Sequence, residues 1–323
     1  MAHKNWMYAV YEAVQYEMRK RKDMVWLFEL TPAVASSPGL PVINLEKEFG
    51  RTRVNNTGID EMWMAGATLG AGMAGITAVT YIPYQGSLIC FEMLQNHAGK
   101  LHYMTGGDAS MPVVFILELS GQSPGFAGQH SDYEIDTYYA HIPGLKVVIP
   151  STPYDAKGMM VSAIRDPNPV AYLFPAGLRQ LSEEVPDEQY TVPLDKAAVR
   201  TSGGDITIVS SGAGMPAALE AAVELQKAGV GVETIDLRAL KPMDTATLVA
   251  SVQKTKRLLT FDQSYYTLCP GAEVIARVAE NVDGARYKRI AFPDAPPPAS
   301  PEMFNWMRPN AGHIVAAARK MLA

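Results

Sequence analysis

The chain of 323 residues has few cysteines and few charged residues. Cys90 and Cys269 are its only cysteines, too few and too far apart for a disulfide framework or a thiolate metal site. This usage predicts a reducing, cytoplasmic compartment. Charged residues make up 19% of the chain, below the roughly 25% of an average soluble protein. Fewer charges than usual indicate that another subunit covers part of the surface.

An excess of positive charge and a long apolar run are also missing. Lys and Arg number 28 against 33 Asp and Glu, a formal net charge of −5, so the chain lacks the basic surface that nucleic-acid phosphates require. The basic run 19–22 is interpreted as the last turn of an N-terminal helix, where cations complement the helix dipole. Glu12 and Glu17 place charges among the apolar residues of that helix, which excludes a signal peptide or a membrane span. We expect neither nucleic acid nor membrane as a partner.

An apolar content of 48% excludes a disordered chain. Short apolar runs alternate with amphipathic stretches of helix length, which is typical of parallel strands with helices on both faces. The alternation stops between Pro175 and Gly204, a stretch that we interpret as a surface linker, and then resumes. The predicted fold is α/β, with two consecutive three-layer α/β domains at residues 1–190 and 191–323. The predicted strands are 24–29, 76–82, 113–118, 146–149, 170–174, 205–210, 231–237, 257–261 and 287–291, and the predicted helices are 61–74, 87–104, 154–165, 215–228, 245–254, 272–281 and 311–322.

Small residues fill the predicted helix 61–74, although glycine costs roughly 1 kcal/mol in a helix. This composition indicates that another helix or a ligand approaches the backbone closely on one face. The glycines fall inside the helix rather than before it, which excludes the phosphate-binding turn of a dinucleotide fold. Asp60 and Glu61 stand at the N-terminus of the helix. A carboxylate there either complements the helix dipole or is held against a ligand.

His130 has the most favourable sequence surroundings for acid–base chemistry among the histidines. It follows the predicted strand 113–118 and the polar loop 120–125. Ligands of open α/β sheets bind beyond the carboxyl ends of the strands, and a loop histidine there is a candidate proton donor. We therefore predict that His130 faces a ligand; the alternative is a histidine that stabilises its loop.

Several runs of residues, spread over nearly the whole chain, resemble one enzyme family. The stretch 140–158 closely resembles the β subunit of the thiamine-diphosphate-dependent E1 component of 2-oxo acid dehydrogenases, a transketolase-like family that includes the pyruvate, branched-chain and acetoin dehydrogenases. The order of the runs is that of the family, which argues against chance similarity. The other matching runs are the helix that begins at Glu61, residues 103–107, residues 129–131, residues 163–169 and residues 235–244.

The resemblance implies a pyrimidine-binding domain followed by a transketolase C-terminal-like domain. It places Glu61 at the position of the family's glutamate, which is hydrogen-bonded to N1′ of the cofactor's aminopyrimidine. That hydrogen bond promotes removal of the thiazolium C2 proton. It also assigns Gln129 and Tyr84 to cofactor binding and His130 to catalysis on the substrate side of the site. The catalytic residues implied by the resemblance are therefore Glu61 and His130.

The resemblance further implies two metal ions, of which this chain holds one. The run 163–169 matches a structural potassium loop whose oxygens come from Ala163, Ile164, Asp166 and Asn168, and hard oxygen ligands suit such a cation. The Gly-Asp-Gly…Asn motif that binds Mg²⁺ and the diphosphate is missing from this chain. In the family that motif lies on the α subunit, so the resemblance implies an α₂β₂ heterotetramer in which this chain carries the pyrimidine half of each site.

The resemblance predicts the β subunit of an enzyme that decarboxylates a 2-oxo acid and transfers the acyl group to a lipoyl carrier on an acyltransferase, E2. The main alternative is cleavage or carboligation of an α-hydroxyketone without a lipoyl partner. A non-catalytic scaffold subunit and a nicotinamide dehydrogenase are the alternatives from other classes. The chain departs from the family's pattern at Phe28-Glu29-Leu30, at Gly177-Leu178-Arg179 and at 268–273, and these departures leave the acyl group open.

Overall fold

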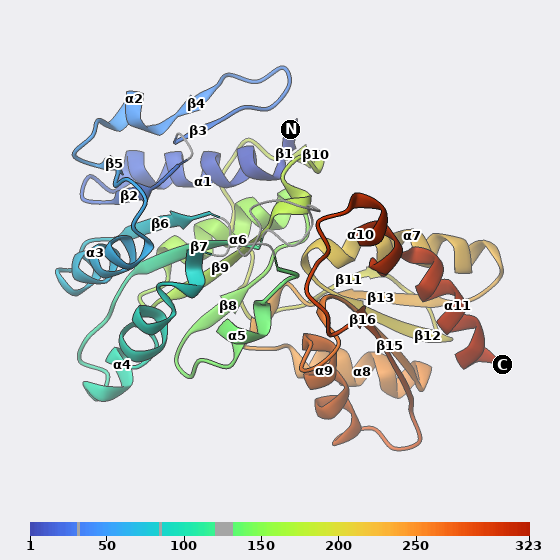
Figure 1. Ribbon diagram of the computed structural model, residues 1–323. Coiled ribbons are helices and arrows are strands. Elements are labelled where there is room, and N and C mark those ends of the chain that lie inside the picture. Colours follow the sequence, from blue (N-terminus) through green and yellow to red (C-terminus); the bar gives the residue numbers. More distant parts are fainter. Residues whose placement is uncertain (31–32, 84–85, 120–131) are drawn as a thin grey trace. The chain divides into compact units, whose positions relative to one another are not determined.

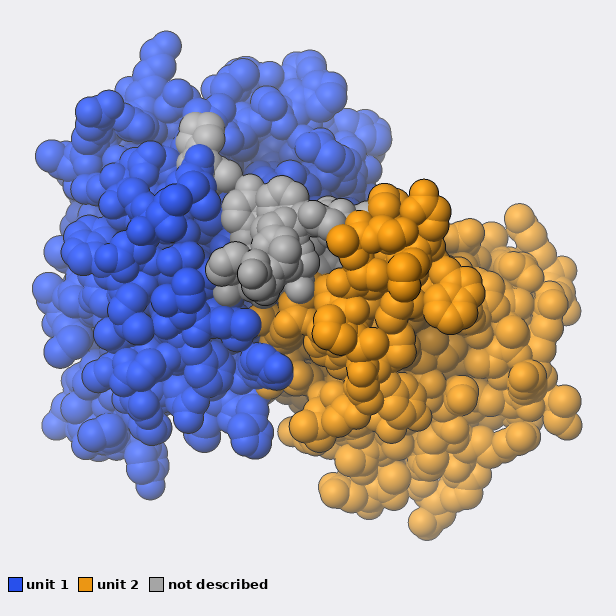
Figure 2. Space-filling view, in the orientation of Figure 1, with its two compact units in different colours: residues 1–120, 138–194 blue, residues 121–137, 195–323 orange. Residues whose placement is uncertain are grey.

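A computed structural model describes residues 1–30, 33–83, 86–119 and 132–323. The chain divides into two compact units, coloured separately in Figure 2. Unit 1 comprises Met1–Ser120 and Tyr138–Leu194, and unit 2 comprises Gly121–Thr137 and Asp195–Ala323. The domain boundary between residues 190 and 191 stays a prediction from the sequence.

Unit 1 is built on parallel strands (Figure 1). They lie in the order β8 (Lys146–Val148), β9 (Val170–Pro175), β7 (Val113–Leu119), β6 (Ala78–Ile82), β2 (Val25–Phe28) and β5 (Val54–Asn56). Every residue of β6, β7 and β9 is buried. A continuous apolar run is what a parallel strand covered on both faces requires.

Helices cover both faces of these strands. Helices α1 (Trp6–Lys20) and α6 (Pro153–Arg165) pack together over one face, where the Trp6 ring stacks on Phe174 of β9 with centroids 4.6 Å apart. Lys157 of α6 is fully buried there and pairs with Glu12 of α1 at 2.7 Å. Helix α3 (Glu61–Met73) covers the other face and packs on β6 and β7.

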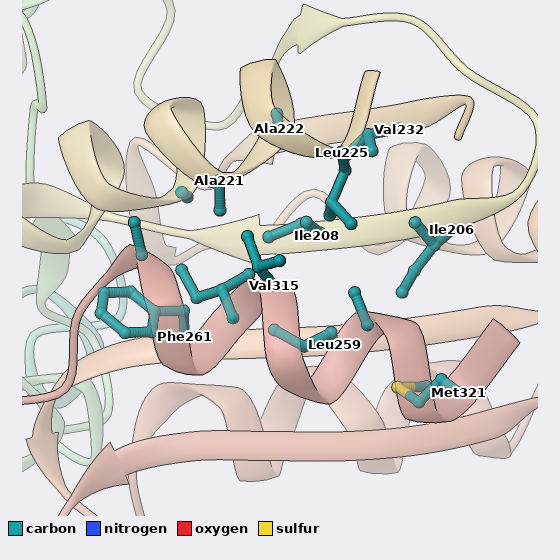
Figure 3. Close-up of a cluster of buried hydrophobic side chains, with 14 of the residues drawn as sticks. Ile206, Ile208, Ala221, Ala222, Leu225, Val232, Leu259, Phe261, Val315 and Met321 are labelled. Carbon is teal, nitrogen blue, oxygen red and sulfur yellow. The ribbon is translucent and has the colours of Figure 1, made fainter. Parts of the chain in front are cut away.

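Unit 2 has a five-stranded sheet in the order β11 (Ala198–Thr201), β13 (Val232–Asp236), β12 (Ile206–Ser210), β15 (Arg257–Tyr265) and β16 (Arg286–Phe292). Strand β11 runs antiparallel to β13, and the other pairings are parallel. Helices α7 (Met215–Lys227) and α11 (Ala311–Leu322) pack against each other, as do α8 (Thr245–Thr255) and α9 (Pro270–Ala279). Figure 3 shows Ile208, Leu259 and Val315 in the core cluster between sheet and helices. The predicted α/β fold with two consecutive three-layer α/β domains is confirmed.

Two local expectations are wrong. The predicted helix 87–104 is broken into a 3₁₀ turn at Gly86–Leu88, a π-helix at Met93–Ala98 and α4 (Leu101–Met104). The predicted linker 175–204 contains β10 (Ser182–Val185), which pairs antiparallel with β1 (Ala2–Asn5), and β11. Strands that pair with segments distant in the sequence carry little local signal, since their register is set by the partner. The remaining elements are β3 (Val34–Ala35), β4 (Ile43–Asn44), α2 (Leu45–Phe49), α5 (Asp136–Ala140), β14 (Ala239–Lys241) and α10 (Pro301–Met307).

None of the helices in the described ranges combines the length and the apolar character that crossing a membrane demands.

Candidate functional site

Glu61 lies at the carboxyl edge of the unit 1 strands, where ligands of parallel sheets bind. Strand β5 ends at Asn56, and α3 begins at Glu61 after four intervening residues. The Asp60 carboxylate caps the helix by accepting a hydrogen bond from the Trp63 N–H at 2.9 Å. This cap leaves Glu61 in the first turn, where the partial positive charge of the helix N-terminus favours a carboxylate.

A second carboxyl group, that of Glu29, lies beside Glu61. Glu29 directly follows β2, is fully buried and accepts a hydrogen bond from the Asp60 N–H at 3.0 Å. Burial, followed by the negative charge of Glu61, raises the pKa of Glu29 to about 7. In the sequence, Glu29 stands out only as part of Phe28-Glu29-Leu30, where the chain departs from the family's pattern. An acidic residue at the end of a buried strand is the signal that could have found it.

Gly86 makes room for the Glu61 carboxyl group. A Cβ atom at Gly86 would lie 2.5 Å from Glu61 Oε1 and 2.8 Å from its Cγ. Next to it, Ser87 Oγ is hydrogen-bonded to the Tyr139 hydroxyl, and the Cys90 thiol donates to the Ser87 carbonyl at 3.4 Å. Burial, with the charges of Glu61 and Glu29 adding to its effect, raises the pKa of Cys90 to about 12. The Cys90 thiol is therefore uncharged and lines the site rather than acting as a nucleophile.

These groups give the site two carboxyls of different character. Glu29 is buried and holds its proton below about pH 7, whereas the Glu61 side chain is half-buried at a helix N-terminus. Two neighbouring carboxyls with separate environments can hold and transfer a proton near neutral pH. Such a pair can share a proton with a basic nitrogen of a ligand.

Three predicted site residues lie outside the described residues. Tyr84 falls in 84–85, and Gln129 and His130 fall in 120–131. Their assignments to cofactor binding and to catalysis stay predictions.

The predicted potassium loop follows α6. The Asp166 N–H donates to the Ala163 carbonyl at 3.2 Å, and the Asp166 carboxylate accepts from the Asn168 N–H at 2.9 Å and pairs with Lys146 Nζ at 2.5 Å. Asn168 Oδ1 is buried without a hydrogen-bond partner in the described ranges. An unsatisfied buried oxygen fits a cation ligand. The Ile164 backbone lies in the last turn of α6, beside these groups.

The outward face of α3 carries apolar and small side chains. Trp63 is 51% exposed and Met73 is 68% exposed. Between them, a Cβ atom on Gly66 or Gly70 would meet no atom of the described chain within 4 Å. Exposed apolar residues that continue along one helix face, together with glycines that permit close approach, are typical of an interface with another protein.

Both halves of the chain match known protein domains. Residues 2–180 match the pyrimidine binding domain of transketolase, and residues 195–314 match the transketolase C-terminal domain. A solved split gene transketolase, an inactive β4 tetramer, superposes with a TM-score of 0.79 at 20% identity and covers 97% of this chain and 96% of that one. At that identity the likeness shows the fold alone.

Relatives with higher identity cover almost the whole chain. The pyruvate dehydrogenase E1 component subunit beta of Rhizobium meliloti (strain 1021) is 37% identical over 318 residues, 96% of this chain and 68% of that protein. The acetoin:2,6-dichlorophenolindophenol oxidoreductase subunit beta of Cupriavidus necator is 36% identical over 328 residues, 97% of this chain and 96% of that protein. The chain therefore belongs to the transketolase-like family of the E1 component β subunits, which have a pyrimidine-binding domain followed by a transketolase C-terminal domain.

Proposed function

We propose that this chain is the β subunit of a heteromeric thiamine-diphosphate enzyme that decarboxylates a 2-oxo acid and transfers the acyl group to a lipoyl carrier. The observation that carries the proposal is the Glu61 carboxyl group, which lies against Gly86 in the first turn of α3 and beside the buried Glu29, whose pKa is raised to about 7. Its location in a domain that matches the pyrimidine-binding family supports a heterocyclic ligand with a basic nitrogen.

Each predicted residue has a defined task in this proposal. Glu61 holds a proton at N1′ of the aminopyrimidine, and Glu29 buffers the charge of Glu61 because the two carboxyls disfavour simultaneous ionisation. Tyr84 and Gln129 bind the cofactor, and His130 donates a hydrogen bond to the substrate oxygen. Thiamine diphosphate, when bound, supplies a carbon nucleophile and an electron sink.

The proposal includes an α subunit that binds Mg²⁺ and the diphosphate. Two relatives are named as β subunits, and the exposed apolar stripe of α3 supplies a surface for another chain. An α₂β₂ heterotetramer is the proposed assembly, with the lipoyl acyltransferase E2 as a further partner. We also propose that Ala163, Ile164, Asp166 and Asn168 bind a structural K⁺, because Asn168 Oδ1 is buried without a hydrogen-bond partner among the described residues.

A second candidate function is cleavage or carboligation of an α-hydroxyketone without a lipoyl partner. The relative that supports it is an acetoin oxidoreductase subunit at 36% identity, against 37% for a pyruvate dehydrogenase subunit. The two functions separate in one assay of the assembled enzyme. Turnover of a 2-oxo acid with a lipoyl domain supports the first, and turnover of acetoin with dichlorophenolindophenol as the electron acceptor supports the second.

Substitution of the two catalytic residues tests the mechanism. In the assembled enzyme, Glu61→Gln should slow exchange of the cofactor's C2 proton by orders of magnitude, because the amide cannot hold the N1′ proton. His130→Ala should lower turnover by roughly 10²–10³-fold and leave C2 exchange unchanged, since its task lies on the substrate. Near wild-type exchange in Glu61→Gln would reduce that residue to a helix-dipole role. Loss of cofactor in His130→Ala would show that the histidine does not act on the substrate. A chain that has kept the fold only as a scaffold would show neither effect.

A further inference from the structure

Unit 2 contains a buried group of three carboxyls that the proposed function does not use. Glu134, Asp136 and Asp262 are 1%, 1% and 6% exposed. The backbone brings them together, because the Glu134 N–H donates to the Gln263 carbonyl at 3.0 Å and Glu134 forms a parallel bridge with Ser264 of β15. Residues 132–137 therefore lie along the carboxyl-terminal half of β15.

Aromatic rings hold the same segment. The Tyr133 ring stacks on Phe292 of β16 with centroids 3.8 Å apart and an interplanar angle of 15°. Its edge contacts Tyr265, with centroids 4.9 Å apart, and the Tyr265 hydroxyl donates to the Asp132 carboxylate. Residues 132–137 are thus held on unit 2 by aromatic contacts at one end and by the three buried carboxyls at the other.

The groups that face Glu134 and Asp136 compensate their charges only in part. The Ala213 N–H donates to the Glu134 carboxylate, and the Arg308 guanidinium faces it. The Ser264 hydroxyl and the Thr137 N–H, the latter at 2.9 Å, donate to Asp136. Burial, followed by the neighbouring carboxylates, raises the pKa of both Glu134 and Asp136.

Asp262 is the third member of the group. Its Oδ1 accepts from the Gly271 N–H at 3.2 Å, the Cys269 thiol also donates to it, and the Arg289 guanidinium faces it. Burial raises its pKa to about 7. Within the described ranges, Glu134 Oε1 and Asp262 Oδ2 are buried without a hydrogen-bond partner. Because the pKa of each carboxyl is raised, bound protons compensate the charge that Arg289 and Arg308 leave.

We propose that these carboxyls form a protonation-dependent latch, which holds residues 132–137 on β15 while protonated and releases them on ionisation. Three buried like charges repel one another and cost far more than the hydrogen bonds return. The latched state binds more protons than the open state, whose solvated carboxyls titrate near pH 4. The latch is therefore closed in mild acid and weakens as the pH rises through 7. In the sequence, the latched segment follows directly after Gln129-His130-Ser131.

Hydrogen exchange of the intact chain tests the latch without cofactor, substrate or turnover, so its outcome is independent of the proposed function. The probe is the Glu134 amide, with the Ile208 amide in the core strand β12 as the reference for global unfolding. Each additional proton in the latched state changes the opening constant about tenfold per pH unit. After correction for intrinsic exchange, protection of the Glu134 amide should stay below that of Ile208 and should fall by about 100-fold or more between pH 5 and pH 7, since one proton over two pH units already gives about 100-fold.

A variant with only one of the three carboxyls supplies the second arm. The double variant Asp136→Asn, Asp262→Asn keeps the size of both side chains and removes two of the three titrations, so its protection profile should be much flatter. Asp283→Asn, an exposed substitution in the same unit, should follow the wild type. Protection in the wild type that does not change between pH 5 and pH 8 overturns the latch, whether or not the double variant folds. A double variant that titrates like the wild type overturns it as well.

Discussion

Replacement of Gly86 by alanine tests whether the position of the Glu61 carboxyl group limits the reaction. The added Cβ would lie 2.5 Å from Glu61 Oε1. Ordinary van der Waals contact begins at 3.4 Å, so the carboxyl group must move by about 0.9 Å. The Cγ atom, at 2.8 Å from the added Cβ, has to move with it, and rotation about the last bond alone is therefore insufficient.

The expected effect on activity is much larger than the effect on stability. Misplacement of a reacting group by about 1 Å can lower the rate on the order of 10²-fold. The stability should fall by only about 1 kcal/mol, the lower limit of the usual overpacking cost, because the half-buried Glu61 side chain can move aside. Gly86 has no positive φ, so alanine adds no backbone strain there. In the enzyme assembled with its α subunit, Gly86→Ala should slow C2 proton exchange by about 10²-fold.

Two comparisons make this result interpretable. Gly204→Ala adds a Cβ with no atom of the described chain within 4 Å and should leave the exchange rate unchanged. Once Glu61→Gln has removed the proton transfer, addition of Gly86→Ala should cost nothing more, because the two residues act as one unit. A further loss in the double variant, or full activity in Gly86→Ala, would refute the argument that Gly86 acts through the Glu61 carboxyl.

Three more predictions concern stability. The pKa of Glu29 is raised to about 7 in the folded chain, so protonated Glu29 stabilises the fold in acid. The free energy of unfolding should therefore fall as the pH rises from about 5 to 7, by at most about 1.4 kcal/mol per pH unit for one proton. In urea titrations, Glu29→Gln should make this fall smaller. K⁺ should raise the melting temperature of the wild type over equal Na⁺, whereas Asn168→Leu should abolish the difference, and an equal response of both would exclude Asn168 as a ligand. Leu259→Ala, in the unit 2 core, should lower the free energy of unfolding by about 2–5 kcal/mol, measured by chemical denaturation against the exposed substitution Val223→Ala.

Local patterns in the sequence predict the α/β class, the family and most strands of the two sheets, although β5 and β11 escape them. Buried parallel strands such as β7 are continuous apolar runs, and amphipathic helices such as α7 have a 3.6-residue period. Both patterns can therefore be recognised in the sequence without knowledge of the fold. The same local signals predict a helix N-terminus at Glu61, whereas the functional role of this glutamate rests on the resemblance to the family.

The tertiary structure alone decided which distant residues meet. Gly86 and Glu29 are separated from Glu61 by 25 and 32 positions, and only the parallel arrangement of β2, β5 and β6 brings all three to one edge of the sheet. Strand β10 pairs with β1 from the other end of unit 1, and the Glu134 segment lies on β15 from more than a hundred residues away. Raised carboxyl pKa values arise from this burial and proximity, which no local pattern of residues records.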